Sequence, residues 1–412
     1  MTDSNPWPIS LRVAFRFCCC YLLLYSLPQG GTVNLLQSLP GGGKISQPYL
    51  NLWHAVCPWV AVHIFHLGGK AVTYFPTGSG DTTLDYVLQL LFIVVAAIGT
   101  LAWSILDHRR RDYRALYAWL RLLVRYTLAF TLFGYGFAKV FPLQFQPASL
   151  RRLAEPYGEF SPMGVLWSFM GASQAYTIFG GAAEALGGFL LLFRRTTTLG
   201  AMTAFAVLAN VVAMNFCYDV PVKLYSTNLL LMCVFLLAPD LRRLLDVLVL
   251  NRPSAPARLY AIRFQRRWMR ILAVVFCVLF VGYELSNEIV QGWRFYRQVY
   301  VAPIHPPLYG IYNVESGAPT AWRKVIFENA RSVAVRTDTG ELLTFPLEYA
   351  GPGLRINGAD QYTWTKPDAG HLVLTGQWAG APSTIRLAKV DPARFLLKSR
   401  GFHWINELPL NR

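Results

Sequence analysis

The chain has 412 residues, of which 54% are hydrophobic and only 15% are charged, and its formal net charge is +16. A soluble protein of this length carries about a quarter charged residues, so the composition excludes an ordinary soluble enzyme and indicates a membrane protein. The basic residues occur in short segments between apolar runs and form no single long patch, so we expect no nucleic-acid partner.

Seven apolar runs approach the length of about 20 residues that crosses a bilayer. They cover about residues 10–27, 83–105, 122–141, 174–193, 198–216, 224–239 and 271–290. The first run lacks a small-residue cleavage site, so we expect an uncleaved helix and not a signal peptide. The sequence thus predicts a mainly α membrane protein with about seven transmembrane helices.

The loops that follow the second, fourth and sixth runs are rich in arginine, as in 107–114, 194–195 and 242–270. Arginine-rich loops stay in the cytoplasm, next to anionic lipid. The alternation predicts a multi-pass protein of the cell inner membrane with a cytoplasmic N-terminus. Everything after the seventh run is then extracytoplasmic, and the lipid bilayer is the first partner.

The loop 28–81 is long for a connection between helices, so we expect it to have structure of its own. Its segment 50–69, LNLWHAVCPWVAVHIFHLGG, predicts a short amphipathic or re-entrant helix near the outer surface. His54, His63 and His66 are too few to predict a metal site. The seven cysteines show no paired spacing, which is typical of small apolar side chains in helices.

The character of the chain changes after about residue 295. Segment 332–345 alternates as two strands around an Asp-Thr-Gly turn, and segment 371–390 reads as a second hairpin. Several short strands in about a hundred residues predict an antiparallel β-barrel or sandwich. This region contains no cysteine, so we expect it to fold without disulfide or metal. The ending 400–412 is predicted to dock against the barrel or the membrane.

Lys139 lies near the outer end of the third run. Its ammonium could extend to the lipid headgroups. Alternatively, Gly134, Gly136 and Ala138 would allow close helix packing that buries the lysine stem inside the bundle. Tyr135, one helical turn away, could then hydrogen-bond the ammonium.

Glu184 lies about ten residues from either end of the fourth run, so a helix places it near mid-bilayer. A carboxylate at that depth cannot reach the headgroups. It must face the protein and be either protonated or paired. We therefore expect a functional role or a buried pair for Glu184.

The joint between the fifth and sixth runs is NFCYDVPVKLYSTN, residues 215–228. Pro221 is expected to begin the sixth helix. Asp219 would then lie at or beside the N-cap, where its carboxylate accepts from free N–H groups, and Lys223 would pair with it. This reading does not explain why further polar residues gather there, namely Asn210, Asn215, Tyr218, Ser226 and Asn228.

Lys139 after a glycine-rich helical turn, then EALGGFLLLFRRTTTLGA at 184–201 and DVPVK at 219–223, resembles the DoxX-like membrane family. The resemblance covers about residues 120–245. It implies a compact four-helix bundle linked to quinone and sulfur redox systems, including a thiosulfate:quinone oxidoreductase subunit. A helical bundle joined to a β-rich extracytoplasmic domain is also loosely similar to vitamin K-dependent carboxylases, in architecture only.

These expectations divide the chain into four parts. Residues 1–120 hold the first transmembrane helices and the long outer loop, and residues 121–245 form the DoxX-like bundle. Residues 246–294 contain a cytoplasmic linker and the last transmembrane helix. Residues 295–412 form the extracytoplasmic β-domain.

The first functional hypothesis is a quinone-linked redox component. A quinone or similar isoprenoid ring would enter an outward-facing polar hollow, with Glu184 at its floor about 15 Å below the membrane face. Lys139, Glu184 and Tyr218 are the catalytic candidates, which would bind and protonate the ring. The ligand-binding candidates are Tyr135, Asn210, Asn215, Asp219, Lys223 and Ser226.

No haem pair, iron–sulfur spacing or dinucleotide fingerprint occurs in the sequence. We therefore expect no cofactor held by the chain itself, apart from a possible quinone ligand, and electrons would come from an envelope redox partner. The second hypothesis is not enzymatic. In it, the bundle anchors the β-domain, which binds a lipid or an envelope protein, and the polar cluster only holds helices together.

Overall fold

The computed structural model describes most of the chain. The described residues are 6–26, 41–74, 78–257, 262, 264–318, 321–351, 353–358, 360–401, 403 and 410. The chain forms two compact units, and each of them is discontinuous in sequence. The first unit comprises Met1–Gln144 and Ile178–Trp293, and the second comprises Phe145–Thr177 and Arg294–Arg412. The sequence analysis grouped 145–177 with the bundle, whereas this segment belongs to the unit that contains the β-domain.

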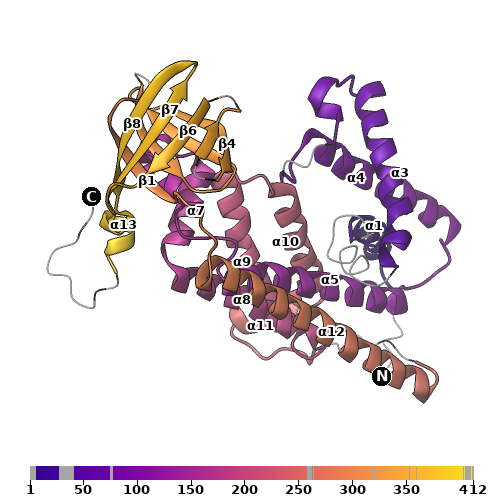
Figure 1. The fold of residues 1–412 in the computed structure, drawn as a ribbon. Coiled ribbons are helices and arrows are strands. Elements are labelled where there is room, and N and C mark those ends of the chain that lie inside the picture. The colour runs from indigo at the N-terminus through magenta and orange to yellow at the C-terminus, as the bar shows by residue number, and fades with distance from the viewer. Residues whose placement is uncertain are drawn as a thin grey trace. The chain divides into compact units, whose positions relative to one another are not determined.

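Among the described residues, seven helices are long and apolar enough to cross a membrane, which confirms the predicted number of spans. They are α1 Ile9–Ser26, α4 Thr83–Leu106, α5 Arg114–Val140, α8 Gln174–Leu192, α9 Thr197–Cys217, α10 Lys223–Leu237 and α12 Arg267–Tyr296 (Figure 1). A 3-10 turn, η3 Ala238–Asp240, and helix α11 Leu241–Leu248 extend α10. A π-helical segment, η4 Arg297–Val301, extends α12. The chain is therefore a multi-pass membrane protein.

Helix α3 Gly42–His63 lies in the long loop between α1 and α4 and is longer than predicted. It begins eight residues before the predicted segment 50–69 and ends six residues before that segment does. It tolerates two internal prolines, Pro48 and Pro58. The helix ends early because His66 has a left-handed φ of 54°, and the glycine turn at 68–69 follows. A 3-10 turn, η1 Gly69–Val72, completes this segment.

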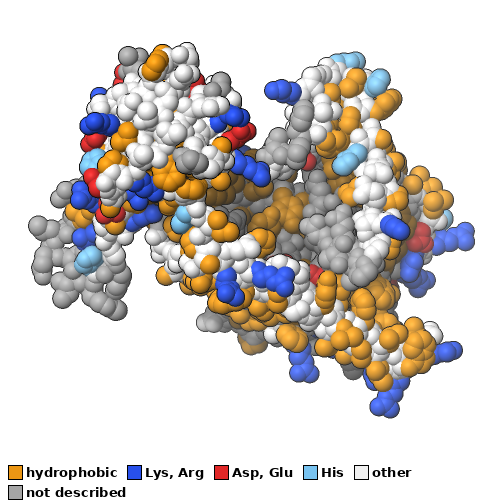
Figure 2. Space-filling model, in the orientation of Figure 1, with side chains coloured by type: hydrophobic (Ala, Val, Ile, Leu, Met, Phe, Trp, Pro, Cys, Tyr) orange, Lys and Arg blue, Asp and Glu red, His pale blue; other side chains and the backbone are white. Residues whose placement is uncertain are grey.

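Helix α5 is the central helix of the membrane unit. It is buried along most of its length, and its aliphatic and aromatic side chains join those of α1, α4, α9 and α10 in one core. Helix α12 differs, because most of its apolar side chains are exposed and only a few, such as Phe280, Val281 and Leu285, pack against this core. Figure 2 shows this apolar surface along α12, with basic side chains at its first turns. A helix that presents apolar residues to its surroundings in this way is suited to lipid.

The β-domain is a closed barrel of eight antiparallel strands, and each strand pairs with its neighbours in sequence order. The strands are β1 Gly310–Ser316, β2 Trp322–Phe327, β3 Ser332–Thr337, β4 Leu342–Ala350, β5 Gly353–Ile356, β6 Asp360–Thr365, β7 His371–Trp378 and β8 Ala381–Val390. Both predicted hairpins are confirmed, as β3–β4 and β7–β8. Pairing of β1 with β8 closes the sheet, so the domain is a barrel and not a sandwich.

Large apolar side chains fill the barrel. Leu308, Phe327, Leu354, Leu372 and Leu387 are all almost fully buried in its core. An eight-stranded barrel is just wide enough for its own side chains to fill the interior. The barrel core is therefore a packed one. The short segments η5 Pro392–Arg394 and α13 Leu396–Ser399 follow the last strand, and most of the predicted docking segment 400–412 lies outside the described residues.

The connector between α5 and α8 packs on the outside of the barrel. It contains α6 Leu150–Ala154, η2 Tyr157–Glu159 and α7 Pro162–Ala172. Leu150 and Ala154 are buried in a second apolar cluster with Ile311, Ile326 and Ala334 of the barrel. The backbone N–H of Leu150 donates to the Glu328 carboxylate at 2.6 Å, and Arg336 forms an ion pair with Glu159. These contacts explain why residues 145–177 belong to the barrel unit.

Candidate functional site

Lys139 and Glu184 form an ion pair inside the membrane unit. Lys139 lies in the last turn of α5, and Glu184 lies in the middle of α8. The Lys139 ammonium donates to Glu184 Oε2 at 2.8 Å, and the two residues are only 7% and 4% exposed. The lysine therefore points into the bundle, which rules out the headgroup-facing alternative. Glu184 contacts Lys139 directly, and its predicted depth of about 15 Å below the membrane face stays a prediction.

Glycines bring the backbones of α5 and α8 close together beside this pair. A Cβ atom on Gly136 would lie 2.9 Å from the Gly181 carbonyl oxygen. A Cβ atom on Gly181 would lie 2.5 Å from the Gly136 oxygen and 2.6 Å from Lys139 Cβ. Carbon atoms do not approach this closely, so neither position accepts a side chain without separation of the helices. The sequence analysis predicted close packing at Gly136, and its partner on α8 is Gly181.

Two tyrosine rings extend the surroundings of Lys139 toward α10. The Lys139 ammonium lies 5.5 Å from the centre of the Tyr135 ring and 3.4 Å from the Tyr135 carbonyl oxygen. The predicted contact thus exists, and it uses the carbonyl oxygen and the ring face of Tyr135. The Tyr135 ring lies 6.2 Å from that of Tyr225 on α10, whose hydroxyl is 3.5 Å from Thr131 Oγ1.

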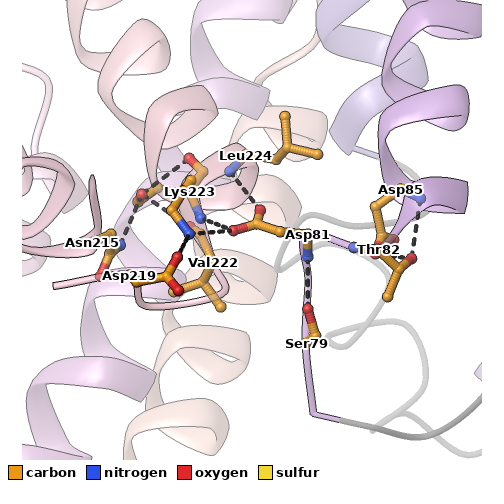
Figure 3. A network of polar contacts seen from close by, with 10 residues as sticks. Ser79, Asp81, Thr82, Asp85, Asn215, Asp219, Val222, Lys223 and Leu224 are labelled. Atoms are coloured by element: carbon orange, nitrogen blue, oxygen red, sulfur yellow. Dashed lines mark hydrogen bonds and ion pairs between the residues drawn. The ribbon is translucent and has the colours of Figure 1, made fainter. Parts of the chain in front are cut away.

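A second polar group joins α9, α10 and the start of α4 (Figure 3). Asn215 is buried and donates through Nδ2 to Ser226 Oγ at 3.0 Å. The Lys223 ammonium donates to Asp219 at 2.9 Å and lies 3.9 Å from Asp81. The predicted Asp219–Lys223 pair is present, and the Asp219 side chain is 84% exposed.

The prediction that Asp219 caps the sixth helix is wrong. Helix α10 begins at Lys223, two residues after Pro221, and its N-cap residue Val222 makes no side-chain capping bond. Asp81, from the distant segment before α4, accepts instead from the backbone N–H groups of Lys223 and Leu224, at 2.7 and 2.9 Å. Asp219 has a left-handed φ of 52° and takes part in the turn before the helix, so its carboxylate is not directed at the free N–H groups.

Segment 79–85 ties two helix starts together in Figure 3. Thr82 and Asp85 form a capping box at the beginning of α4, while the neighbouring Asp81 caps α10. The backbone N–H of Gly80 donates to the Pro221 carbonyl oxygen at 2.8 Å. This arrangement gives the turn between α9 and α10 a fixed position against α4.

The remaining predicted residues lie outside these two groups. The side chain of Tyr218 is partly exposed and makes no hydrogen bond with any described residue. Asn210 lies on an exposed face of α9. Asn228 is buried and belongs to a third polar cluster, in which the hydroxyl of Tyr21 contacts both Gln89 and Asn228.

Several residues of these polar groups were not predicted from the sequence. Asp81 and Tyr225 carried no local signal, because their importance depends on contacts with distant segments. Glu284 and Glu288 did carry a local signal, because they are two carboxylates one helical turn apart inside the seventh apolar run. Glu284 is buried, and the Glu288 carboxylate lies over Gly134, 3.7 Å from where a Cβ atom on that glycine would be.

A group of titratable side chains on the barrel surrounds His371. On its surface, the hydrogen bond and charge of Asp368 raise the pKa of His371, and Glu315 adds to the effect. The same hydrogen bond lowers the pKa of Asp368. Burial raises the pKa of Tyr349 to about 12. In the part of the chain that the structure describes, no group of three or more His, Cys, Asp and Glu residues is arranged to hold a metal ion.

Comparison with known proteins gives one relative. The chain is 37% identical to a protein of Bacillus subtilis (strain 168), named uncharacterized protein YwoB, over 123 residues. The matched segment is 30% of this chain and 78% of that protein. No protein-family model matches the chain, and no solved structure matches it.

Proposed function

The chain belongs to the family of the Bacillus subtilis protein YwoB, and from its buried Lys139–Glu184 pair we propose that it binds the head group of a quinone-type ligand within its helical bundle. The ligand would be an isoprenoid quinone or a ring of similar chemistry that enters from the lipid. The site would serve a membrane redox reaction. The DoxX-like resemblance of residues 120–245 supports this choice of ligand.

The ion pair is the observation that carries the proposal. Removing two charges from water costs several kcal/mol per ion, and apolar residues of similar volume often replace a buried pair without loss of stability. Glycine packing between α5 and α8 already holds these helices together without it. A buried ion pair that only held two helices together would therefore cost more free energy than an apolar contact in the same place. Ionisable groups inside a membrane commonly mark a ligand site or a proton pathway.

The chemistry of the pair suits a quinone. Reduction of a quinone to a quinol takes up two electrons and two protons. The Lys139 ammonium is a hydrogen-bond donor for a carbonyl oxygen of the ring, and Glu184 is an acid–base group beside it. Tyr135 and Tyr225 offer aromatic surfaces for the ring. The electrons would come from an envelope redox partner.

The orientation proposed for the chain places this site near the extracytoplasmic face. The arginine-rich segments 107–114, 194–195 and 242–270 lie where α4, α8 and the α10–α11 helix end. With these ends in the cytoplasm, the last turn of α5 and the first turn of α10 lie on the opposite side. Lys139, Asp219 and Lys223 would then share one membrane face, as the predicted hollow requires.

Organic-solvent extraction of the purified full-length protein tests the proposal. We expect about one quinone per chain. The double variant K139M/E184M removes both charges and keeps similar volume, so it should fold and lose the quinone. The surface variant E348Q changes a carboxylate of the barrel that pairs with Arg355, and it should keep the wild-type amount. Phospholipid alone in the wild-type extract would contradict the proposal.

One observation favours the second candidate function, a non-enzymatic anchor. The connector 145–177 is packed on the barrel, so α5, α8 and α12 all lead into one folded unit, which the proposed orientation puts outside the cytoplasm. Such a scaffold suits the presentation of the barrel to a lipid or an envelope protein. In this case the extract contains no quinone, and the K139M/E184M variant is as active in the cell as the wild type.

A further inference from the structure

Two arginines of α5 are buried at the opposite end of the bundle from Lys139. Arg121 and Arg125 are one helical turn apart, and each is only 8% exposed. Arg121 Nη1 donates to the Leu236 carbonyl oxygen at 2.6 Å, and Arg125 Nη2 donates to that of Leu192 at 3.3 Å. Leu192 is the last residue of α8, and Leu236 is in the last turn of α10. The two guanidinium groups thus meet carbonyl ends of helices, where cations are favourable.

The hydrogen bond to the end of α8 does not satisfy every donor of the Arg125 guanidinium. Its Nε–H is buried and has no hydrogen-bond partner among the described residues. The ring of Tyr126 lies 5.3 Å from Arg125 Cζ, and the Tyr126 hydroxyl contacts Cys277 Sγ at 2.9 Å. A helix end carries only about half a unit charge, so the end of α8 cannot balance a whole guanidinium. A buried charged donor without an acceptor is costly.

The acidic residues near this end of the bundle are engaged by other groups. Segments 107–125, 192–200 and 236–270 contain sixteen arginines and only four aspartates. The aspartates interact as follows: Asp107 with Tyr113 and Arg110, Asp112 with Arg114, Asp240 with Arg243 and Thr198, and Asp246 with Arg252. None of these interactions involves Arg125. No aspartate of these segments therefore balances the charge of Arg125.

We propose that Arg125 binds a phosphate group at the arginine-rich end of the bundle, with Arg121 one turn away adding to its positive field. The planar guanidinium presents donors in a fork that matches phosphate oxygens. The site lies where α8 and its apolar run end and Arg194 and Arg195 follow. Basic pockets between transmembrane helices at this level take the head groups of anionic phospholipids. The same chemistry would accept a free phosphate ion.

The test uses the purified full-length protein in a zwitterionic detergent. The midpoint of thermal unfolding is measured with added phosphatidylglycerol, phosphatidylcholine or inorganic phosphate. We expect phosphatidylglycerol to raise the midpoint and phosphatidylcholine not to. In R125Q, the concentration of phosphatidylglycerol needed for half of the effect should rise about tenfold. The matched control R270Q removes an exposed arginine at the start of α12 and should respond like the wild type.

The outcomes separate the sources of the phosphate. A response to inorganic phosphate that equals the response to phosphatidylglycerol assigns the site to a free anion. Equal responses of R125Q and R270Q, or a wild-type protein that does not distinguish phosphatidylglycerol from phosphatidylcholine, would overturn the proposal. If R125Q does not fold, native mass spectrometry of R125K decides the matter. We expect it to retain fewer bound phosphatidylglycerol molecules than R270Q, and equal retention would reject the site.

Discussion

The ion pair of Lys139 and Glu184 shows what single residues can and cannot reveal. Hydropathy alone indicated that a carboxylate in the middle of α8 must face protein, and it does. The glycines around Lys139 indicated a buried stem. The sequence did not indicate that the two side chains meet, because the contact joins positions 45 residues apart on different helices. The prediction that both side chains face the bundle was therefore right, whereas Tyr218 and Asn210 lie outside the polar groups and the depth of the hollow stays a prediction.

The first prediction concerns the energy of this pair. In K139M, Glu184 stays buried without its cation, and we expect a loss of about 3–5 kcal/mol in the free energy of unfolding. K139M/E184M should lose much less, because neither charge remains. Chemical unfolding of the two single variants and the double variant in detergent measures the coupling. Additive losses would show that the pair is not a unit.

The second prediction concerns pH and the barrel surface. Asp368 raises the pKa of His371 above its ordinary value of about 6.5. The folded state therefore binds the proton more tightly than the unfolded state does. The resulting stabilisation is fully present below about pH 6.5, and it is lost as the pH rises through the folded pKa. NMR titration of isotopically labelled histidine, assigned with H371Q, should show this raised pKa, and D368N should lower it. An unchanged pKa in D368N would contradict the contact.

Two adjacent glycines of α8 have different surroundings, and only one of them lies against α5. Gly181 faces α5, whereas a Cβ atom on the neighbouring Gly180 would meet nothing within 4 Å. G181A should therefore separate α5 from α8 and destabilise the protein by roughly 1–3 kcal/mol. G180A should be neutral or stabilising by up to about 1 kcal/mol, because alanine favours helix. Thermal unfolding of the two variants tests this contrast, and equal midpoints would contradict the close contact.

The start of α10 supplies a second prediction about an element. Asp81 accepts from two of its first backbone N–H groups, so D81A should cost about 1 kcal/mol. Hydrogen exchange at Leu224 should become faster. The exposed control D219N removes a surface ion pair and keeps a residue that tolerates the left-handed φ of 52°, so it should change stability by at most about 0.5 kcal/mol. If D219N has the larger effect, the assignment of the cap to Asp81 is incorrect.

The local sequence explains why Asp219 was predicted as the cap of α10. An aspartate shortly before a helix start is the usual local signal for a cap. Asp81 is 142 residues away from the N–H group that it accepts from, and no local pattern can relate the two. The β3–β4 and β7–β8 hairpins were predicted correctly for the converse reason. Their strands are adjacent in sequence, and turn residues such as Gly340 and Gly380, both with positive φ, mark the reversals.

At the scale of the whole molecule, the number of spans and the class of the C-terminal domain followed from apolar length and strand alternation. The division of the chain into two discontinuous units did not follow from these patterns. Residues 145–177 lie between two apolar runs, which made them look like a simple connection. Their packing on the barrel depends on side chains such as Leu150 and Glu159. The partners of these side chains are more than 150 residues further along the chain.

A prediction at the same scale concerns the orientation of the chain in the membrane. The arginine-rich segments predict that the C-terminal domain is extracytoplasmic. A reporter that is active only outside the cytoplasm, fused after Arg412, should be active. The same reporter fused after Arg195, in an arginine-rich loop, should be inactive. The reverse pattern, in fusions that insert normally, would refute the orientation.

The discontinuous barrel unit has a consequence for biosynthesis. The ribosome completes the connector at Thr177 more than 200 residues before the last barrel strand ends at Val390. At about 5–20 residues per second, this interval lasts roughly 10–40 s. During that time the apolar face of α6, with Leu150 and Ala154, has no barrel to cover it. Nascent chains halted before β1 should therefore expose this face and recruit chaperones, and release of the finished barrel should end their association.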